Sequence, residues 1–127
     1  MSAQQLHDTR QKVLVVDDDR ALRELLADYL GRVGFEVRTA QDGRAGLHAL
    51  GESRFDLILT DYRMPAMTGL EMATYIRRSD TITPIILITG DSSTLDSEVI
   101  AQAGITRVLP KPLKINELLS ECSLTAV

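Results

Sequence analysis

Five short apolar runs, each followed by a segment with helical periodicity, constrain the fold of this 127-residue chain more than any other feature. The runs lie at residues 13–16, 35–40, 56–60, 84–88 and 105–109. The first, third and fourth are apolar without alternation, which is typical of parallel strands covered on both faces. The helical patterns lie in residues 22–30, 45–50, 70–76, 95–103 and 115–119. Five alternating units indicate an α/β fold with one parallel sheet and helices on both faces.

Length and composition narrow the class of protein further. Hydrophobic residues make up 44% and charged residues 25% of the chain, as in an ordinary globular domain. A net charge of -4 disfavours a general nucleic-acid binder, and no apolar run approaches the ~18 residues of a membrane span. The single Cys122 excludes an internal disulfide, and residues 1–12 contain no secretory signal. We therefore expect one cytoplasmic domain over residues 12–127, preceded by a loose tail over residues 1–11.

Residues that can carry chemistry follow four of the five predicted strands. In chain order they are Asp17, Asp18 and Asp19, then Asp61, then Thr89, then Lys111. In an open parallel sheet, ligands bind outside the carboxyl ends of the strands. We therefore expect these side chains to meet at one edge of the sheet.

Carboxylates that crowd together repel one another, and a hard divalent cation such as Mg²⁺ removes that repulsion. A site of this kind suits phosphoryl chemistry, because a metal and a lysine neutralise the phosphoryl oxygens while a carboxylate serves as nucleophile. The hydroxyl of Thr89 can donate a hydrogen bond to the same group. One acid of the triplet, Asp19, is expected to cap the following helix, but three acids in a row exceed that need.

Four motifs in this order make the sequence resemble a response-regulator receiver domain, the phosphoacceptor module of two-component signalling. They are VLVVDDD, LILTDYRMPAMTGLE, PIILITG and LPKPL, and the resemblance covers about Lys12 to Leu119. It implies a doubly wound (βα)5 fold of the flavodoxin-like kind, with strand order 2-1-3-4-5. It also implies a cis peptide bond between Lys111 and Pro112.

The resemblance further implies a role for each site residue. Asp61 is the phosphoacceptor, Lys111 pairs with the phosphoryl oxygens, and Thr89 is the switch residue that moves towards the phosphoryl group. Asp18 and Asp61 bind Mg²⁺ directly, together with the backbone carbonyl of Arg63, while Asp17 acts through water. We assign the acidic pair of the family to Asp17 and Asp18, and a shift to Asp18 and Asp19 stays open.

Departures from the family pattern modify these expectations. The second switch position, often Phe or Tyr, is Val108 here, so we expect a muted or rerouted conformational change. Two variable positions near the site entrance, Arg63 and Asp91, carry opposite charges and could pair to screen the attacking water, which would tune the phosphoryl lifetime. Pro110 lacks a backbone donor and is expected where its strand leaves the sheet.

The resemblance also implies partners. A histidine kinase or histidine phosphotransfer protein is expected to dock near the 22–30 helix and the Pro112–Leu113 loop. The surface of 95–103, 105–109 and 115–119 is the expected output or dimer face, without direct contact with nucleic acid or membrane. The module would catalyse only its own phosphoryl transfer and autodephosphorylation, as a stand-alone regulator or as a receiver cut from a longer protein.

Three other interpretations of the sequence remain as alternatives. A haloacid-dehalogenase-like phosphohydrolase would use Asp17 as nucleophile, but position 21 is Ala and the length leaves no room for a cap domain. A flavodoxin-like cofactor binder is disfavoured because three carboxylates would repel its phosphate. A receiver-like interaction module without phosphorylation is disfavoured because the set of site residues is complete.

Overall fold

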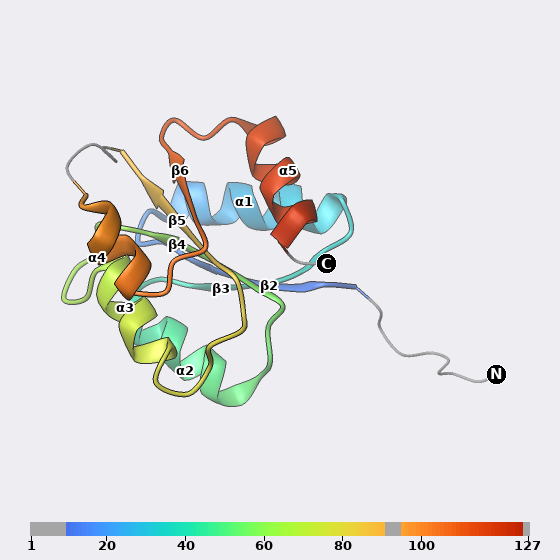
Figure 1. Cartoon of the computed structure of the whole chain (residues 1–127). Coiled ribbons are helices and arrows are strands. Elements are labelled where there is room, and N and C mark those ends of the chain that lie inside the picture. Colours follow the sequence, from blue (N-terminus) through green and yellow to red (C-terminus); the bar gives the residue numbers. More distant parts are fainter. Residues whose placement is uncertain (1–9, 91–94, 126–127) are drawn as a thin grey trace.

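The computed structural model describes residues 10–90 and 95–125, and these form a five-stranded parallel sheet with helices on both faces (Figure 1). The strands are β2 (Lys12–Val16), β3 (Glu36–Ala40), β4 (Leu57–Asp61), β5 (Ile85–Thr89) and β6 (Arg107–Pro110). They lie in the order β3-β2-β4-β5-β6, and every neighbouring pair is parallel. This is the 2-1-3-4-5 order expected of a flavodoxin-like fold.

Five helices cover the sheet within the described ranges. They are α1 (Arg20–Arg32), α2 (Gly43–Glu52), α3 (Gly69–Ile76), α4 (Ser97–Gln102) and α5 (Ile115–Thr125). Figure 1 shows α1 and α5 on one side of the sheet and α2, α3 and α4 on the other. The two faces of the sheet thus each have a helical layer, as the unbroken apolar runs predicted.

The strand β2 shows how one run of apolar residues supplies both layers. Val13 and Val15 belong to the core beneath α1 and α5, while Leu14 and Val16 belong to the core beneath α2 and α3. Successive side chains of a strand point to opposite faces, so a strand buried on both faces must be apolar throughout. Every residue of β4 and β5 is also buried, and their residues are apolar except at the carboxyl ends, where Thr60 and Asp61 end β4 and Thr89 ends β5.

Side-chain caps fix where the helices begin. The carboxylate of Asp19 accepts hydrogen bonds from the backbone amides of Ala21 and Leu22 at 3.0 and 3.3 Å, which confirms the expected cap of α1. Thr68 and Glu71 form a capping box at the start of α3, each side chain accepting from the backbone amide of the other. These bonds satisfy amides that have no partner within the helix.

The helix α4 differs from the expectation in its length and its burial. The pattern over 95–103 predicted a helix that ends at Gly104, and the helix observed is shorter, from Ser97 to Gln102. None of the residues of α4 is buried, and Val99 is 47% exposed. The buried residue of this segment is Ala103, just beyond the helix. Helical spacing indicates a helix but not how much of its apolar stripe a neighbour covers.

The end of β6 agrees with a smaller expectation, whereas the expected tail is described only in part. Pro110 is the last residue of β6, an edge strand, where the missing backbone donor disturbs no ladder. The carbonyl of Gln11 accepts from the amide of Glu36 at 2.9 Å, just before β2 begins. Residues 1–9 lie outside the described ranges, so the tail over 1–11 stays a prediction. Within the described ranges, no helix is long and apolar enough to cross a membrane.

Candidate functional site

The carboxyl ends of four parallel strands bring the predicted site residues to one edge of the sheet. Asp17 directly follows β2, Asp61 ends β4, Thr89 ends β5, and Lys111 directly follows β6. The Lys111 amide donates to the Thr89 carbonyl at 2.8 Å, which ties the end of β6 to the end of β5. The peptide bond between Lys111 and Pro112 is cis, as the resemblance implied.

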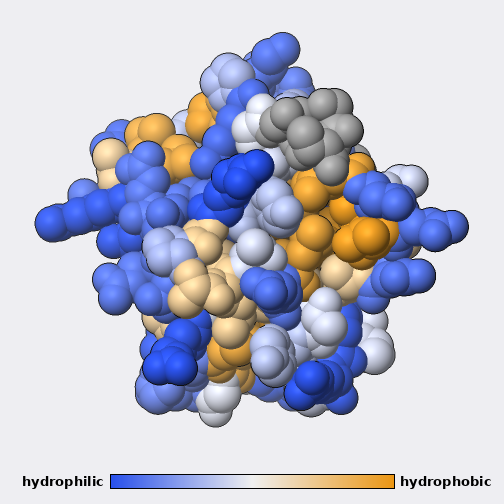
Figure 2. All heavy atoms as spheres, turned by 90° about the vertical axis from the view of Figure 1, so that its left-hand side faces the viewer, coloured by the Kyte–Doolittle hydropathy of each residue, from blue (hydrophilic) through white to orange (hydrophobic). Residues whose placement is uncertain are grey.

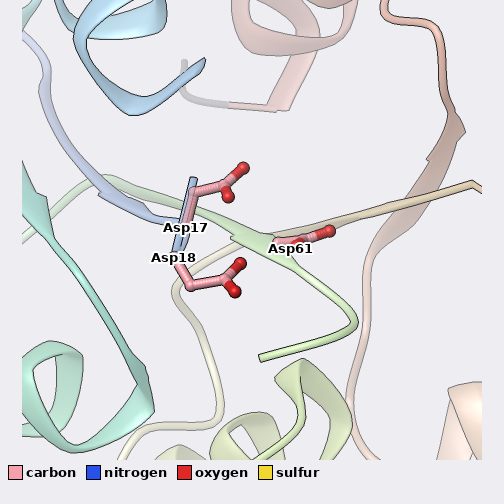
Figure 3. A group of neighbouring side chains, drawn as sticks. All are labelled: Asp17, Asp18 and Asp61. Carbon is pink, nitrogen blue, oxygen red and sulfur yellow. The ribbon is translucent and has the colours of Figure 1, made fainter. Parts of the chain in front are cut away.

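Three carboxylates form the centre of this edge. Oxygen atoms of Asp17, Asp18 and Asp61 all lie within 4.8 Å of one another. Figure 3 shows their carboxylates on the same side of the ends of β2 and β4. Asp17 and Asp61 are 1% and 5% exposed, whereas Asp18 is exposed. The cluster therefore has a buried floor and one acid that faces the solvent.

Hydrogen bonds give the three consecutive acids, Asp17, Asp18 and Asp19, different roles in the turn after β2. The backbone amide of Asp17 donates to the carbonyl of Ala40 at 3.1 Å, which extends the pairing of β2 with β3. The Oδ1 atom of Asp17 accepts from the amide of Asp19 at 2.9 Å. Because the side chain of Asp19 caps α1, the geometry supports Asp17 and Asp18, rather than Asp18 and Asp19, as the pair beside Asp61.

An ion pair connects the carboxylate cluster to the end of β6. The Nζ atom of Lys111 lies 3.0 Å from Oδ1 of Asp61. Burial raises the pKa of the Asp61 carboxyl, the Lys111 ammonium opposes that rise, and the charge of Asp18 adds to it. Lys111 thus favours the ionised form of Asp61, the form that a nucleophile needs.

Asp17 is the least satisfied of the three acids. Burial raises the pKa of its carboxyl, the amide of Asp19 opposes the rise, and the charge of Asp61 adds to it. Its Oδ2 atom is buried and has no hydrogen-bond partner among the described residues. A buried carboxylate oxygen without a partner is costly, and a cation or its bound water would satisfy it.

The donor set fits Mg²⁺. This ion takes oxygen ligands and is usually held by one or two carboxylates, with waters and a phosphate oxygen completing its octahedral shell. Two buried carboxylates and one exposed carboxylate at one edge offer such oxygens and leave an open side. The unpartnered oxygen of Asp17 and the mutual repulsion of the three charges are the features that a cation would relieve.

The remaining predicted residues lie around this cluster, and their roles stay predictions. Thr89 is 3% exposed, and Val108 is partly buried in β6, in register with Leu87. The side chain of Arg63 is exposed, with its guanidinium 5.6 Å from the centre of the Tyr62 ring. Asp91 lies outside the described residues, so its pairing with Arg63 stays a hypothesis.

Two residues that contact the site were not among those predicted from the sequence. Gly69 packs so closely on the end of β4 that a Cβ atom there would overlap the carbonyl oxygen of Asp61. Arg23 of α1 donates from Nη1 to the carbonyl of Asp17 at 2.8 Å. A cation six residues after Asp17, on the first turns of the helix that the acids precede, is the sequence signal for Arg23.

Comparisons with known proteins agree with this geometry. Residues 13–123 match the family model of the response regulator receiver domain. The chain is 38% identical over 109 residues to response regulator MprA of Mycolicibacterium vanbaalenii, and 36% identical over 111 residues to DNA-binding response regulator MtrA of Mycolicibacterium paratuberculosis. These matches cover 86% and 87% of this chain but 47% and 49% of the relatives, so the chain spans about half the length of the curated relatives it matches.

Solved structures agree as well. Vibrio cholerae chemotaxis protein CheY4 superposes with a TM-score of 0.88 at 34% identity, over 92% of this chain and 99% of that one. Response regulator protein TrrA of Thermotoga maritima, solved in complex with Mg²⁺-BeF, superposes with a TM-score of 0.83 at 30% identity, over 91% of this chain and 98% of that one. From its sequence, its strand order and these matches, the chain belongs to the response regulator receiver domains of two-component systems.

Proposed function

We propose that Asp61 accepts a phosphoryl group from a phosphohistidine, carried by a histidine kinase or a histidine phosphotransfer protein, with Mg²⁺ as cofactor. The observation that carries this proposal is the position of Lys111 Nζ, 3.0 Å from Oδ1 of Asp61, whose carboxylate lies beside those of Asp17 and Asp18. A nucleophile, a cation for the phosphoryl oxygens and a set of metal ligands are the parts that phosphoryl transfer to a carboxylate needs.

In the transfer, an oxygen of the ionised Asp61 carboxylate forms a bond to phosphorus. The P–N bond of the phosphohistidine breaks, the imidazole nitrogen keeps the electron pair, and water supplies the proton that it then takes up. Lys111 stays charged and neutralises the phosphoryl oxygens, and the Thr89 hydroxyl donates a hydrogen bond to one of them. The burial of Asp61 keeps most water away from the new bond.

Asp18 and Asp61, with the backbone carbonyl of Arg63, would hold the metal, and Asp17 would act through a bound water. When bound, Mg²⁺ supplies charge neutralisation for the phosphoryl oxygens and for the crowded carboxylates. The fit of the donor set and the Mg²⁺-BeF complex of the similar protein TrrA support this part of the proposal.

A hollow beside Lys111 supports docking of the phosphodonor at α1. It has a volume of about 290 Å³ and lies between α1 and the loop that follows β6. Its apolar lining consists of Leu22, Leu25, Leu26, Pro112, Leu113 and Ile115. Leu25 is 57% exposed, more than a core position of α1 would be, and Lys111 itself lines the hollow. A donor seated here would bring its phosphohistidine next to Lys111.

The output surface in this proposal is formed by α4, β6 and α5. Figure 2 looks at the molecule from the side on which α3 and α4 lie in Figure 1, and it shows an apolar area between hydrophilic surroundings. Val99 of α4 is a large apolar side chain that is 47% exposed. Because Val108 has no ring to move between two positions, we propose that Thr89 and α4 transmit the change, to a docking target or to a second copy.

In this proposal, the domain is a signalling module rather than a classical enzyme. It acts in the cytoplasm and slowly hydrolyses its own phosphoryl group. Neither nucleic acid nor membrane is expected to contact this domain itself. MtrA is described as DNA-binding, but it is about twice as long as the part that this chain matches.

A turnover experiment tests this function. The protein is incubated with excess acetyl phosphate and Mg²⁺, and its intact mass and the released inorganic phosphate are followed together. We expect at most one added group of about 80 Da per chain, no added group in EDTA, and slow phosphate release limited by loss of that group. Rapid release of many phosphates per chain without a labelled protein would contradict it and favour a phosphohydrolase.

A further inference from the structure

Arg23 occupies a different environment from the neighbouring arginines of α1. Arg20 and Arg32 form ion pairs within the helix with Glu24 and Asp28, and their side chains are 81% and 75% exposed. The side chain of Arg23 instead runs back towards the start of the helix. Its Nη1 atom donates to the carbonyl oxygen of Asp17 at 2.8 Å, in a partly buried position.

The carbonyl that Arg23 contacts belongs to the peptide group between Asp17 and Asp18. The orientation of that peptide decides where the Asp18 side chain points, because Asp18 begins at its nitrogen end. On either side, the Asp17 amide is held by the Ala40 carbonyl and the Asp19 amide by the Asp17 carboxylate. The bond from Arg23 is the third constraint on this turn, and it comes from a side chain outside the turn.

We propose that Arg23 is a positioning residue, which fixes the Asp17–Asp18 peptide so that the exposed Asp18 carboxylate stays beside Asp61. The inference rests on the proposed Mg²⁺ site and adds a residue that does not itself bind the ion. A planar guanidinium, which is always charged, suits this task, because it holds a carbonyl in a defined direction without titrating.

Two effects of Arg23 on Mg²⁺ binding have opposite signs, which makes the inference testable. If Arg23 positions Asp18, its loss leaves the Asp18 carboxylate without a fixed orientation and weakens Mg²⁺ binding. If Arg23 acts only as a nearby positive charge, its loss removes a repulsion and tightens binding. Changes to groups that orient metal ligands typically weaken metal affinity about 10- to 100-fold.

The experiment measures the Mg²⁺ dissociation constant by titration calorimetry for the wild type, Arg23→Gln, Arg23→Lys and the control Arg20→Gln. Denaturant unfolding of each protein in EDTA and in Mg²⁺ accompanies it. We expect Arg23→Gln to bind Mg²⁺ on the order of 10-fold more weakly, Arg23→Lys to recover part of the loss, and Arg20→Gln to match the wild type. The extra stability that Mg²⁺ confers should shrink in step with affinity.

Equal or tighter Mg²⁺ binding by Arg23→Gln would overturn the inference, and so would a loss of stability that is the same in EDTA and in Mg²⁺. If Arg23→Gln fails to fold, Arg23→Lys decides, because lysine keeps the charge but lacks the planar guanidinium. An Mg²⁺ affinity of Arg23→Lys equal to that of the wild type would contradict a positioning role. Failure of the wild type to bind Mg²⁺ would instead overturn the metal site of the proposed function, and this inference with it.

Discussion

The Nζ atom of Lys111 lies 3.0 Å from Oδ1 of Asp61, although β6, which precedes Lys111, and β4, which ends at Asp61, are separated by β5. The lysine therefore reaches across the end of an intervening strand to the buried carboxylate. Such a contact sets the charge balance of the site, since one ammonium faces three carboxylates whose oxygens lie within 4.8 Å of one another.

Replacing Lys111 by Met should separate metal binding from phosphoryl transfer. Mg²⁺ should bind more tightly, because a positive charge beside the ion is removed, while labelling by acetyl phosphate should slow by on the order of 100-fold, because the phosphoryl oxygens lose a donor. Calorimetry and labelling rates measure the two effects. Lys114→Met is the control, since Lys114 is 77% exposed and pairs with Glu117. Weaker Mg²⁺ binding by Lys111→Met would contradict this charge balance.

The stability of the metal-free protein should depend on pH through Asp17. Burial raises the pKa of its carboxyl. A carboxyl with a raised pKa in the folded chain adds stability while it is protonated, below its unfolded pKa of about 4, and that contribution is lost as the pH rises through the folded value. In EDTA, the free energy of unfolding of the wild type should therefore fall over this interval.

Asp17→Asn isolates this effect, because an amide oxygen still accepts from Asp19 while the charge is gone. The variant should have a flatter pH profile than the wild type and should be more stable at pH 8 in EDTA. Added Mg²⁺ should stabilise the wild type more than the variant. Urea unfolding at several pH values makes the comparison, and a variant that is less stable than the wild type at pH 8 in EDTA would contradict the assignment.

Gly69 should be required both for the stability of the fold and for the labelling of Asp61. Its missing side chain leaves room for the carbonyl oxygen of Asp61 and for Leu87, and a Cβ atom would overlap the first and lie 2.8 Å from Cδ1 of the second. Gly69→Ala should lower the free energy of unfolding by about 1–3 kcal/mol and slow the labelling of Asp61, since the strand end must move. Urea unfolding and labelling rates measure both.

Gly31 provides the matched control. A Cβ atom there meets no atom within 4 Å, and the residue lies within α1. Because alanine favours a helix by up to about 1 kcal/mol over glycine, Gly31→Ala should leave labelling unchanged and raise stability slightly. If Gly69→Ala behaves like Gly31→Ala, the close approach of Gly69 to Asp61 has no bearing on the site.

Much of this arrangement could be predicted from the sequence because strand ends obey a simple geometric rule. Unbroken apolar runs identify buried parallel strands, and the residues that follow them must meet at one edge, which brings Asp17, Asp61 and Lys111 together. The direction of a long side chain on a helix follows no such rule, so the reach of Arg23 back to Asp17 became visible only in the structure. The exposure of Val99 was hidden for a similar reason, because spacing does not say which neighbours cover a helix.

The central claim, that Asp61 carries the phosphoryl group, is tested most directly by intact-mass spectrometry after incubation with acetyl phosphate and Mg²⁺. The comparison includes the wild type, Asp61→Asn, and Asp19→Asn, in which asparagine still caps α1. A gain of about 80 Da is predicted for the wild type and for Asp19→Asn, and none for Asp61→Asn. The same gain in Asp61→Asn would contradict the account.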